Sequence, residues 1–296
     1  MADREKSGRS ERLPVALLLV VTVVWGSTFV IVKSAVAHMA VMDFLAWRFG
    51  LATLAMVALS PSALRRLSPR CLWQGAATGL ALAGGYIFQT FGLQHTTAAI
   101  SGFLTGMSVV LTPLMLGLFL RRRISLSAWA ATALAGSGLA VISFARLGFG
   151  LGEWLTLGCA FCFALQIVAL GEWAGGHDHF ALATVQLATT ALCCTAAAAG
   201  EGNLAPPPDL AVWGAVAATA LVATALAFLI QTWAQTRLAP TRVAIVLTME
   251  PVFAGLFAAL AGEELSWRVL VGGAMVLVAM YLVELAPRRR RVAKEA

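Results

Sequence analysis

The sequence predicts an all-α integral membrane protein with ten transmembrane helices, arranged as two inverted-topology five-helix repeats around a central cavity. Three observations support this fold class. The chain has 296 residues, of which 60% are hydrophobic and 12% charged, and its mean hydropathy is +0.85. Soluble domains carry roughly twice that share of charge. Ten apolar runs are long enough to cross a bilayer, and motifs of the first half recur in the second.

A helix that crosses the hydrocarbon core needs roughly 20 mostly apolar residues. The first such run follows a basic start, but it is long and carries Trp25 and Lys33. We therefore interpret it as a transmembrane helix that is not cleaved, rather than as a signal peptide. The connections are short and leave no stretch for a soluble domain. The predicted spans are 13–34, 40–59, 71–94, 98–120, 126–145, 152–172, 180–200, 210–235, 241–261 and 267–286.

The positions of the basic residues predict the orientation, because Lys and Arg are enriched in cytoplasmic loops. With a cytoplasmic N-terminus, 17 of the 21 Lys and Arg residues fall on the inner side, among them Arg121 to Arg123 and Arg288 to Arg291. We expect a multi-pass protein of a bacterial inner membrane with both termini in the cytoplasm. The net charge is +7, but the basic clusters flank apolar runs without interleaved aromatic residues, so no nucleic-acid partner is expected.

The two halves of the chain, residues 1–147 and 148–296, share motifs at matching distances. The segment 88–91 (Phe-Gln-Thr-Phe) corresponds to 230–233 (Ile-Gln-Thr-Trp), and Pro113 and Pro251 are both followed by Gly-Leu-Phe four residues later. Each half is predicted to hold five helices. Because five is an odd number, the second repeat enters the membrane with the opposite orientation. Inverted repeats are typical of secondary transporters, whose substrate site lies near mid-membrane.

Short motifs stand in a recognisable order along the chain. They are Trp25 to Phe29, Arg48-Phe49, Gly92 to Thr97, Gly102 to Gly106, Glu250 to Gly255 and Gly262 to Glu264. In these residues the chain resembles the drug/metabolite transporter superfamily, in its ten-helix EamA branch, and is most similar to the YddG-type aromatic and neutral amino-acid exporters. The resemblance implies a basket of helices around a central cavity, with the fifth and tenth helices at the periphery.

Uncharged polar side chains at membrane depth usually face a cavity or another helix. Tyr86 and Gln89 share one face of the third span, and the repeat pairs Gln89 with Gln231. A cavity for neutral amino acids needs apolar walls and a few fixed polar groups. Trp25, Tyr86, Phe103 and Trp233 are candidates for the walls. Hydrogen bonding between helices is the competing interpretation of the amides. The predicted substrate-binding residues are Trp25, Tyr86, Gln89, Thr105, Gln166 and Gln231.

Two charged residues inside predicted spans have either a structural role or a role in proton coupling. Arg48 can attract a carboxylate, but we favour a pairing with Asp43 and a guanidinium that reaches the headgroups. Glu250 precedes Pro251, which lacks a backbone N–H and so frees a carbonyl group one turn earlier. Glu250 is a candidate proton carrier, and we slightly favour a structural role in which it hydrogen bonds at the break made by Pro251.

These features predict a secondary transporter that exports aromatic or neutral amino acids and related metabolites by alternating access. The alternative is a proton-coupled exporter of drugs or organic cations, although the carboxylate of the small multidrug branch is missing from the first span. An enzyme is not expected, since no phosphate loop, metal cluster or nucleophilic triad stands out. We expect a monomer in the lipid bilayer that needs no cofactor or metal and binds a small-molecule substrate.

The predicted orientation can be tested by labelling. A reagent that does not cross the bilayer should reach single-cysteine tags at both chain ends only from the cytoplasmic side, since ten crossings return the chain to the side where it began. Tags that react from opposite sides would disprove the helix count.

Overall fold

The computed structural model describes residues 2–121, 126–143, 150–202, 204–238, 243, 246–247 and 249–285. Within these ranges the chain is helical and forms no strand, so the predicted all-α class is confirmed there. Several basic residues behind the predicted orientation, including Arg122, Arg123, Arg146, Arg242 and Arg288 to Arg291, lie outside these ranges. The helices are α1 (Ala2–Ala35), α2 (Val41–Leu59), η1 (Pro61–Arg66), α3 (Pro69–Leu93), α4 (Ala98–Thr105), α5 (Met107–Leu120), α6 (Leu126–Ser143), α7 (Leu151–Trp173), η2 (Ala174–Gly176), α8 (His179–Gly200), α9 (Leu210–Ala220), η3 (Leu221–Leu226), α10 (Ala227–Gln235), α12 (Met249–Leu260) and α13 (Trp267–Leu285).

Six helical segments of the described chain are long and apolar enough to cross a membrane, judged by length and composition. Two further apolar helices, Met249–Leu260 and Trp267–Ala279, are shorter. Together they form the framework of a multi-pass membrane protein, while the count of ten crossings stays a prediction. The six segments are Arg12–Ala35, Val41–Leu59, Ala98–Leu120, Leu151–Gly176, His179–Gly200 and Leu210–Gln235.

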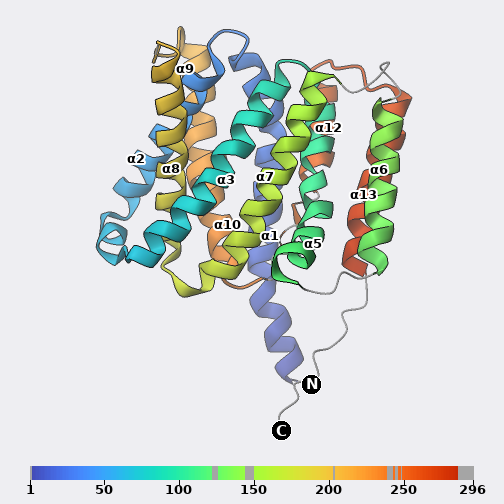
Figure 1. The fold of residues 1–296 in the computed structure, drawn as a ribbon, viewed down its shortest axis with the longest axis horizontal. Helices are drawn as coiled ribbons and strands as arrows, with labels where there is room; N and C mark the ends of the chain where they lie inside the picture. The colour runs from blue at the N-terminus through green and yellow to red at the C-terminus, as the bar shows by residue number, and fades with distance from the viewer. Residues whose placement is uncertain are drawn as a thin grey trace.

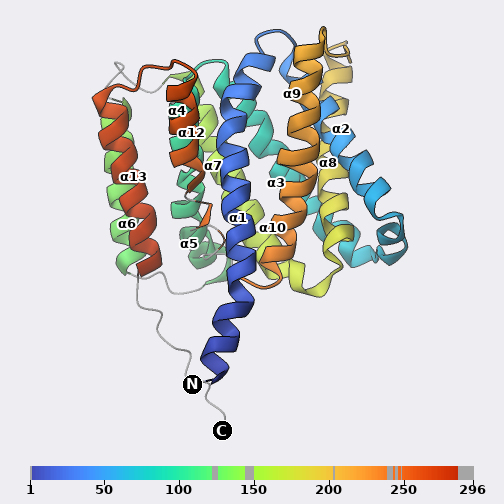
Figure 2. The ribbon, with the colours of Figure 1, turned by 180° about the vertical axis from the view of Figure 1, so that it is seen from behind.

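The long helices stand side by side in one bundle, and α1 begins at the end of the bundle where α13 ends (Figures 1 and 2). The central helix α3 packs against α7 and α8, whereas α1 packs against α12. The pair α6 and α13 forms one edge of the bundle (Figure 1). These two helices are the fifth and tenth predicted spans, for which the resemblance implied a peripheral place.

Side-chain caps explain where several helices begin. Ser68, Thr97, Asp178 and Asp209 directly precede α3, α4, α8 and α9, and each accepts a hydrogen bond from the backbone N–H three residues later, at 2.8 to 3.1 Å. The first N–H groups of a helix have no partner within it, so such caps stabilise the start of the helix.

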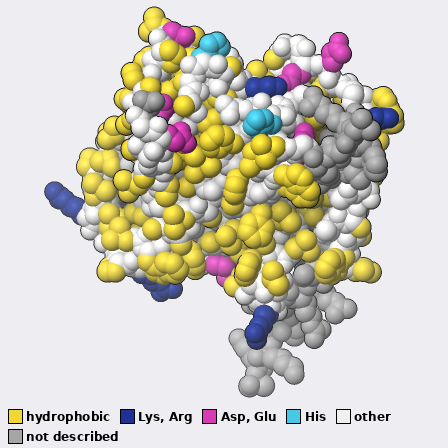
Figure 3. Space-filling model, turned by 45° about the horizontal axis from the view of Figure 1, so that its top comes forward, with side chains coloured by type: hydrophobic (Ala, Val, Ile, Leu, Met, Phe, Trp, Pro, Cys, Tyr) yellow, Lys and Arg dark blue, Asp and Glu magenta, His cyan; other side chains and the backbone are white. Residues whose placement is uncertain are grey.

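The surface of the bundle is apolar, as contact with lipid requires. Figure 3 shows hydrophobic side chains over most of the visible face. Large side chains are exposed along several helices, and Leu118 and Leu192 retain 73% and 70% of their accessible surface. In water this surface would drive aggregation, so lipid is the solvent that suits it.

Glycines allow α1 and α4 to approach α12 closely. A Cβ atom on Gly26 would lie 2.5 Å from the Cβ of Phe253, and one on Gly102 would lie 2.4 Å from the Cβ of Ala254. Small residues at helix interfaces are a common packing device in membranes, because lipid supplies no hydrophobic drive for association. Gly102 of α4 and Gly26 of α1 both have this packing role.

We predict that Gly26→Ala lowers the melting temperature of the purified protein, because the added methyl group must push α1 and α12 apart. Overpacking of this kind costs about 1–3 kcal/mol. The matched control is Gly50→Ala, since a Cβ at Gly50 meets no atom within 4 Å. An unchanged melting temperature for Gly26→Ala would contradict the close packing of α1 on α12.

Candidate functional site

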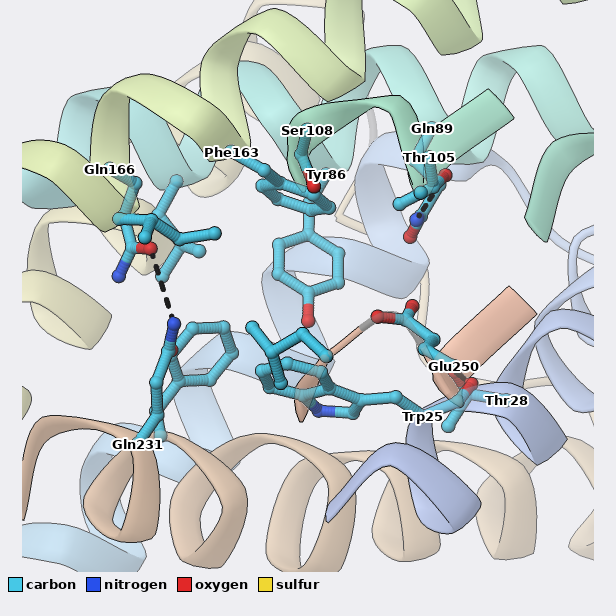
Figure 4. A pocket seen from close by; sticks show the side chains of 15 residues that line it. Trp25, Thr28, Tyr86, Gln89, Thr105, Ser108, Phe163, Gln166, Gln231 and Glu250 are labelled. Carbon is cyan, nitrogen blue, oxygen red and sulfur yellow. Dashed lines mark hydrogen bonds between the residues drawn. The ribbon is translucent and has the colours of Figure 1, made fainter. Parts of the chain in front are cut away.

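A cavity lies inside the bundle, where α1, α3, α7, α10, the α4–α5 junction and the start of α12 meet (Figure 4). Its free space measures about 30 Å³ for the centres of water molecules. A single buried water needs roughly 10–15 Å³ on that measure, so the cavity holds about two waters in this conformation. The lining residues are Trp25, Thr28, Leu82, Tyr86, Gln89, Thr105, Gly106, Ser108, Phe163, Gln166, Ile167, Phe228, Gln231, Leu247 and Glu250.

The structure brings together all six side chains predicted to bind substrate, and Glu250 as well. Both halves of the chain contribute, since Trp25 to Thr105 belong to the first and Gln166 to Glu250 to the second. Gln89 and Gln231, which the repeat pairs, lie on opposite sides of the cavity in Figure 4. Their substrate-binding role stays a prediction.

The amides of the second half form a chain of hydrogen bonds. Gln231 donates to Oε1 of Gln166 at 3.5 Å, Gln166 donates to Oε1 of Gln186 at 3.1 Å, and Gln186 donates to the Thr232 hydroxyl at 3.1 Å. Gln89 donates instead to the Thr105 hydroxyl at 3.2 Å. These amides therefore tie helices together and also face the cavity. Oε1 of Gln231 is buried and accepts no hydrogen bond from the described residues, so it is left as an acceptor beside the cavity.

Three helices each supply an aromatic ring and an amide one turn apart. The pairs are Tyr86 with Gln89 on α3, Phe163 with Gln166 on α7, and Phe228 with Gln231 on α10. The rings lie close together, because the Tyr86 centroid is 5.2 Å from that of Phe163 and 6.1 Å from that of Phe228. The result is an aromatic layer in the middle of the cavity, with amides on either side of it (Figure 4).

The prediction that Phe103 and Trp233 form walls of the cavity is wrong. Phe103 packs against Gly255 and Gly273 outside the cavity, and the Trp233 ring lies 4.2 Å from the guanidinium carbon of Arg237. Phe163 and Phe228 form the walls instead. A signal for them was present in the sequence, since each precedes a cavity glutamine by three residues and so shares its helical face.

Trp25 is held in place by an irregular turn of the facing helix. Its indole N–H donates to the carbonyl oxygen of Ala223 at 2.7 Å, and its ring packs on Phe228 at 5.3 Å. Ala223 belongs to the π-helical turn η3, which lies between α9 and α10. Turns of this kind are frequent at functional sites, because they disturb the regular pairing of backbone groups.

The prediction that Arg48 pairs with Asp43 and reaches the headgroups is wrong. Arg48 is only 1% exposed, its Nε donates to the Thr224 hydroxyl at 2.8 Å, and its guanidinium lies 4.6 Å from the Tyr86 ring centroid. Asp43 accepts a hydrogen bond from the backbone N–H of Ala205 at 3.3 Å instead. Position 48 comes five positions after position 43, and this step places the two side chains about 140° apart around the helix.

Glu250 lies at the start of α12 with its carboxylate directed into the cavity (Figure 4). No described residue donates a hydrogen bond to that carboxylate. Water or a ligand that enters the cavity can therefore donate a hydrogen bond to it. Neither the proton-carrier role nor the structural role predicted for Glu250 is tested by this geometry.

At the end of the bundle away from the start of α1, the carboxylate of Glu263 connects elements of both halves of the chain. Oε1 accepts from Nζ of Lys33 at 2.8 Å and from the N–H of Ala98 at 3.0 Å, and Oε2 accepts from the N–H of Ala99 at 3.2 Å. One side chain thus joins α1, the start of α4 and the loop before α13. The negative charge also suits a helix N-terminus.

Comparisons with known proteins place this geometry in context. The model of the EamA-like transporter family matches residues 12–144 and again residues 150–285. A protein of Archaeoglobus fulgidus named as an uncharacterized transporter is 31% identical over 278 residues, which cover 90% of this chain and 84% of the relative. A solved crystal structure shares the fold, with a TM-score of 0.72 at 19% identity, over 96% of this chain and 99% of the other.

The Glu263 contact predicts a dependence of stability on pH. Burial alone would raise the pKa of Glu263, but hydrogen bonds from Lys33, Ala98 and Ala99 outweigh burial and lower the pKa below its ordinary value of 4.5. The contribution of Glu263 to stability is therefore complete above pH 4.5 and is lost as the pH falls through the lowered pKa. As the pH falls from 4.5 to the lowered pKa of Glu263, the melting temperature of the wild type should therefore fall further than that of Glu263→Gln.

The exposed neighbour Glu264 provides the control for this measurement, because Glu264→Gln removes a carboxylate from the same loop. This variant should keep the pH profile of the wild type. Identical profiles for the wild type and Glu263→Gln would contradict the assigned role of Glu263.

Proposed function

We propose a transport function on the premise that the chain belongs to the EamA-like transporter family. The proposed protein is a secondary transporter that exports aromatic and neutral amino acids and related small metabolites. It would act as a monomer with ten transmembrane helices in a bacterial inner membrane, with both termini in the cytoplasm. The two matched ranges would be inverted repeats of five helices each.

The observation that carries this proposal is the aromatic layer flanked by amides. Rings of Tyr86, Phe163 and Phe228 provide flat apolar surface for a side chain. Amides of Gln89, Gln166 and Gln231 offer both donors and acceptors without a fixed charge. Such a lining suits a zwitterion, which carries one charge of each sign and needs both kinds of group.

Alternating access is the mechanism that fits the size of the cavity. Room for about two waters is too little for an amino acid, so the cavity must widen to bind one. Both halves of the chain line it, so a rocking motion of one half against the other would open it. The contacts of Glu263 with Lys33, Ala98 and Ala99 link the second half of the chain to the first, and in this mechanism they would have to change when the halves move.

A second candidate function is proton-coupled export of drugs or organic cations. The observation that favours it is the carboxylate of Glu250, which faces the cavity with no donor among the described residues. An anionic side chain at this depth attracts cations, and its protonation could be coupled to transport. Arg48, a buried cation whose guanidinium lies 4.6 Å from the Tyr86 ring centroid, weighs against a cationic substrate.

Uptake into proteoliposomes tests the proposed function. We expect concentration-driven uptake of labelled phenylalanine and leucine, with no uptake of a lipophilic organic cation, in vesicles with and without a pH gradient. Uptake of the cation driven by the gradient, and none of either amino acid, would establish the second function and overturn the first.

The same assay tests the role of Glu250. If Glu250 carries the proton, Glu250→Gln should lower gradient-driven flux at least tenfold and leave exchange without a gradient largely unchanged. The control is Glu201→Gln, which removes an exposed carboxylate after α8. Unchanged gradient-driven flux in Glu250→Gln would exclude this side chain as the carrier.

A further inference from the structure

Arg48 is a buried cation without an anionic partner among the described residues. Neither the ion pair of Lys33 with Glu263 nor that of Arg66 with Asp178 involves it. Its polar contacts are the hydroxyl groups of Thr224 and Tyr86. Two aromatic rings also lie beside it, with the Tyr86 and Phe49 ring centroids 4.6 and 5.6 Å from the guanidinium carbon.

A guanidinium in this setting lowers stability compared with an apolar side chain. Hydroxyl groups and aromatic faces compensate only part of the cost of removing the ion from water. Ionisable residues inside membrane helices are rare for this reason, and they usually mark a functional site. The charge of Arg48 therefore calls for a role that a neutral side chain would not fill.

Tyr86 connects this charge with the cavity. Its hydroxyl oxygen accepts a hydrogen bond from Nη2 of Arg48 at 3.4 Å, so its own proton remains free to be donated. Figure 4 shows the Tyr86 hydroxyl directed into the middle of the cavity, on the side of Trp25 and Glu250. A donor that itself accepts a hydrogen bond from a cation is polarised and binds an anionic oxygen more strongly.

We propose that Tyr86, backed by Arg48, is the subsite that binds the carboxylate of the substrate. This inference rests on the proposed function and deepens it, because it names the group that a substrate must carry. The Tyr86 O–H donates to a carboxylate oxygen, and the guanidinium behind the ring stabilises the negative charge. Acceptors for the ammonium group lie elsewhere on the wall, at the carboxylate of Glu250 and the unpartnered Oε1 of Gln231.

The subsite excludes compounds that lack an acid group. A positive ligand that approaches Tyr86 meets the field of Arg48 in surroundings of low dielectric constant, where like charges repel strongly. A neutral amide in place of the carboxylate leaves the polarised hydroxyl without its anionic partner. Selectivity for the acid over its amide and its amine therefore depends on Arg48 and Tyr86.

Competition against uptake of labelled L-phenylalanine in proteoliposomes tests this subsite. For the wild type, we expect L-phenylalaninamide and phenethylamine to compete at least tenfold more weakly than unlabelled L-phenylalanine. In Tyr86→Phe, which keeps the ring and removes one oxygen, the apparent affinity for L-phenylalanine should fall about tenfold. The affinities for the amide and the amine should change less than twofold, so the selectivity is largely lost.

The chain contains two tyrosines, so Tyr281→Phe is a matched control. Tyr281 is 45% exposed on α13, its hydroxyl donates to Sδ of Met249, and it does not line the cavity, so this variant should behave as the wild type. Arg48→Lys serves as a second variant that keeps the charge without the planar guanidinium. It should retain part of the preference for the acid, provided its melting temperature shows that it folds, and a loss as complete as in Tyr86→Phe would contradict a role for the charge.

The outcomes distinguish a failure of the carboxylate subsite from a failure of the proposed transport function. Equal competition by the acid, the amide and the amine in the wild type would overturn the carboxylate subsite and leave the transport function intact. A Tyr86→Phe variant that weakens all three compounds equally would show a structural role and overturn the subsite too. If wild-type protein with a cooperative melting transition takes up no phenylalanine or leucine, the proposed function fails, and the inference fails with it.

Discussion

Lipid offers no hydrogen-bond partner, and this constraint decides where the polar side chains of the protein lie. Gln89, Gln166, Gln186 and Gln231 are buried in the bundle, and each donates its amide to another side chain. Because the outer surface is given over to apolar groups, polar side chains collect inside. Where they collect without filling the space between helices, a wettable cavity is left, and this cavity is the candidate functional site.

Several breaks in regular helix geometry lie next to residues that line the cavity. The junction of α4 and α5 at Gly106 and the π-helical turn η3 both lie next to it, and Pro251 follows the cavity residue Glu250. Each irregularity leaves backbone groups in need of partners, which lipid could not satisfy. The interior supplies one such partner directly, since Trp25 donates to the carbonyl oxygen of Ala223.

Arg48 and Glu250 are not in contact with each other, and their surroundings differ. Arg48 is fixed by Thr224 and by the Tyr86 ring, behind the cavity wall, whereas Glu250 reaches the cavity itself. Their separation keeps either from neutralising the other through a direct ion pair. A cation behind the wall and a carboxyl group on it match a ligand that carries both signs better than one that carries a single sign.

The sequence by itself determined the all-helical membrane class and most of the polar residues of the cavity, whereas the count of ten spans stays a prediction. Composition, the lengths of the apolar runs and the correspondence between Gln89 and Gln231 are all properties of the residue order, so they can be read from the chain without its structure. Only the tertiary structure decided that Arg48 is buried and that Phe163 and Phe228, rather than Phe103 and Trp233, form the walls. The physical reason is that both faces of a membrane helix are apolar, one toward lipid and one toward its neighbours. The pattern of apolar residues then does not reveal which face points inward, and the packing of the other helices settles it.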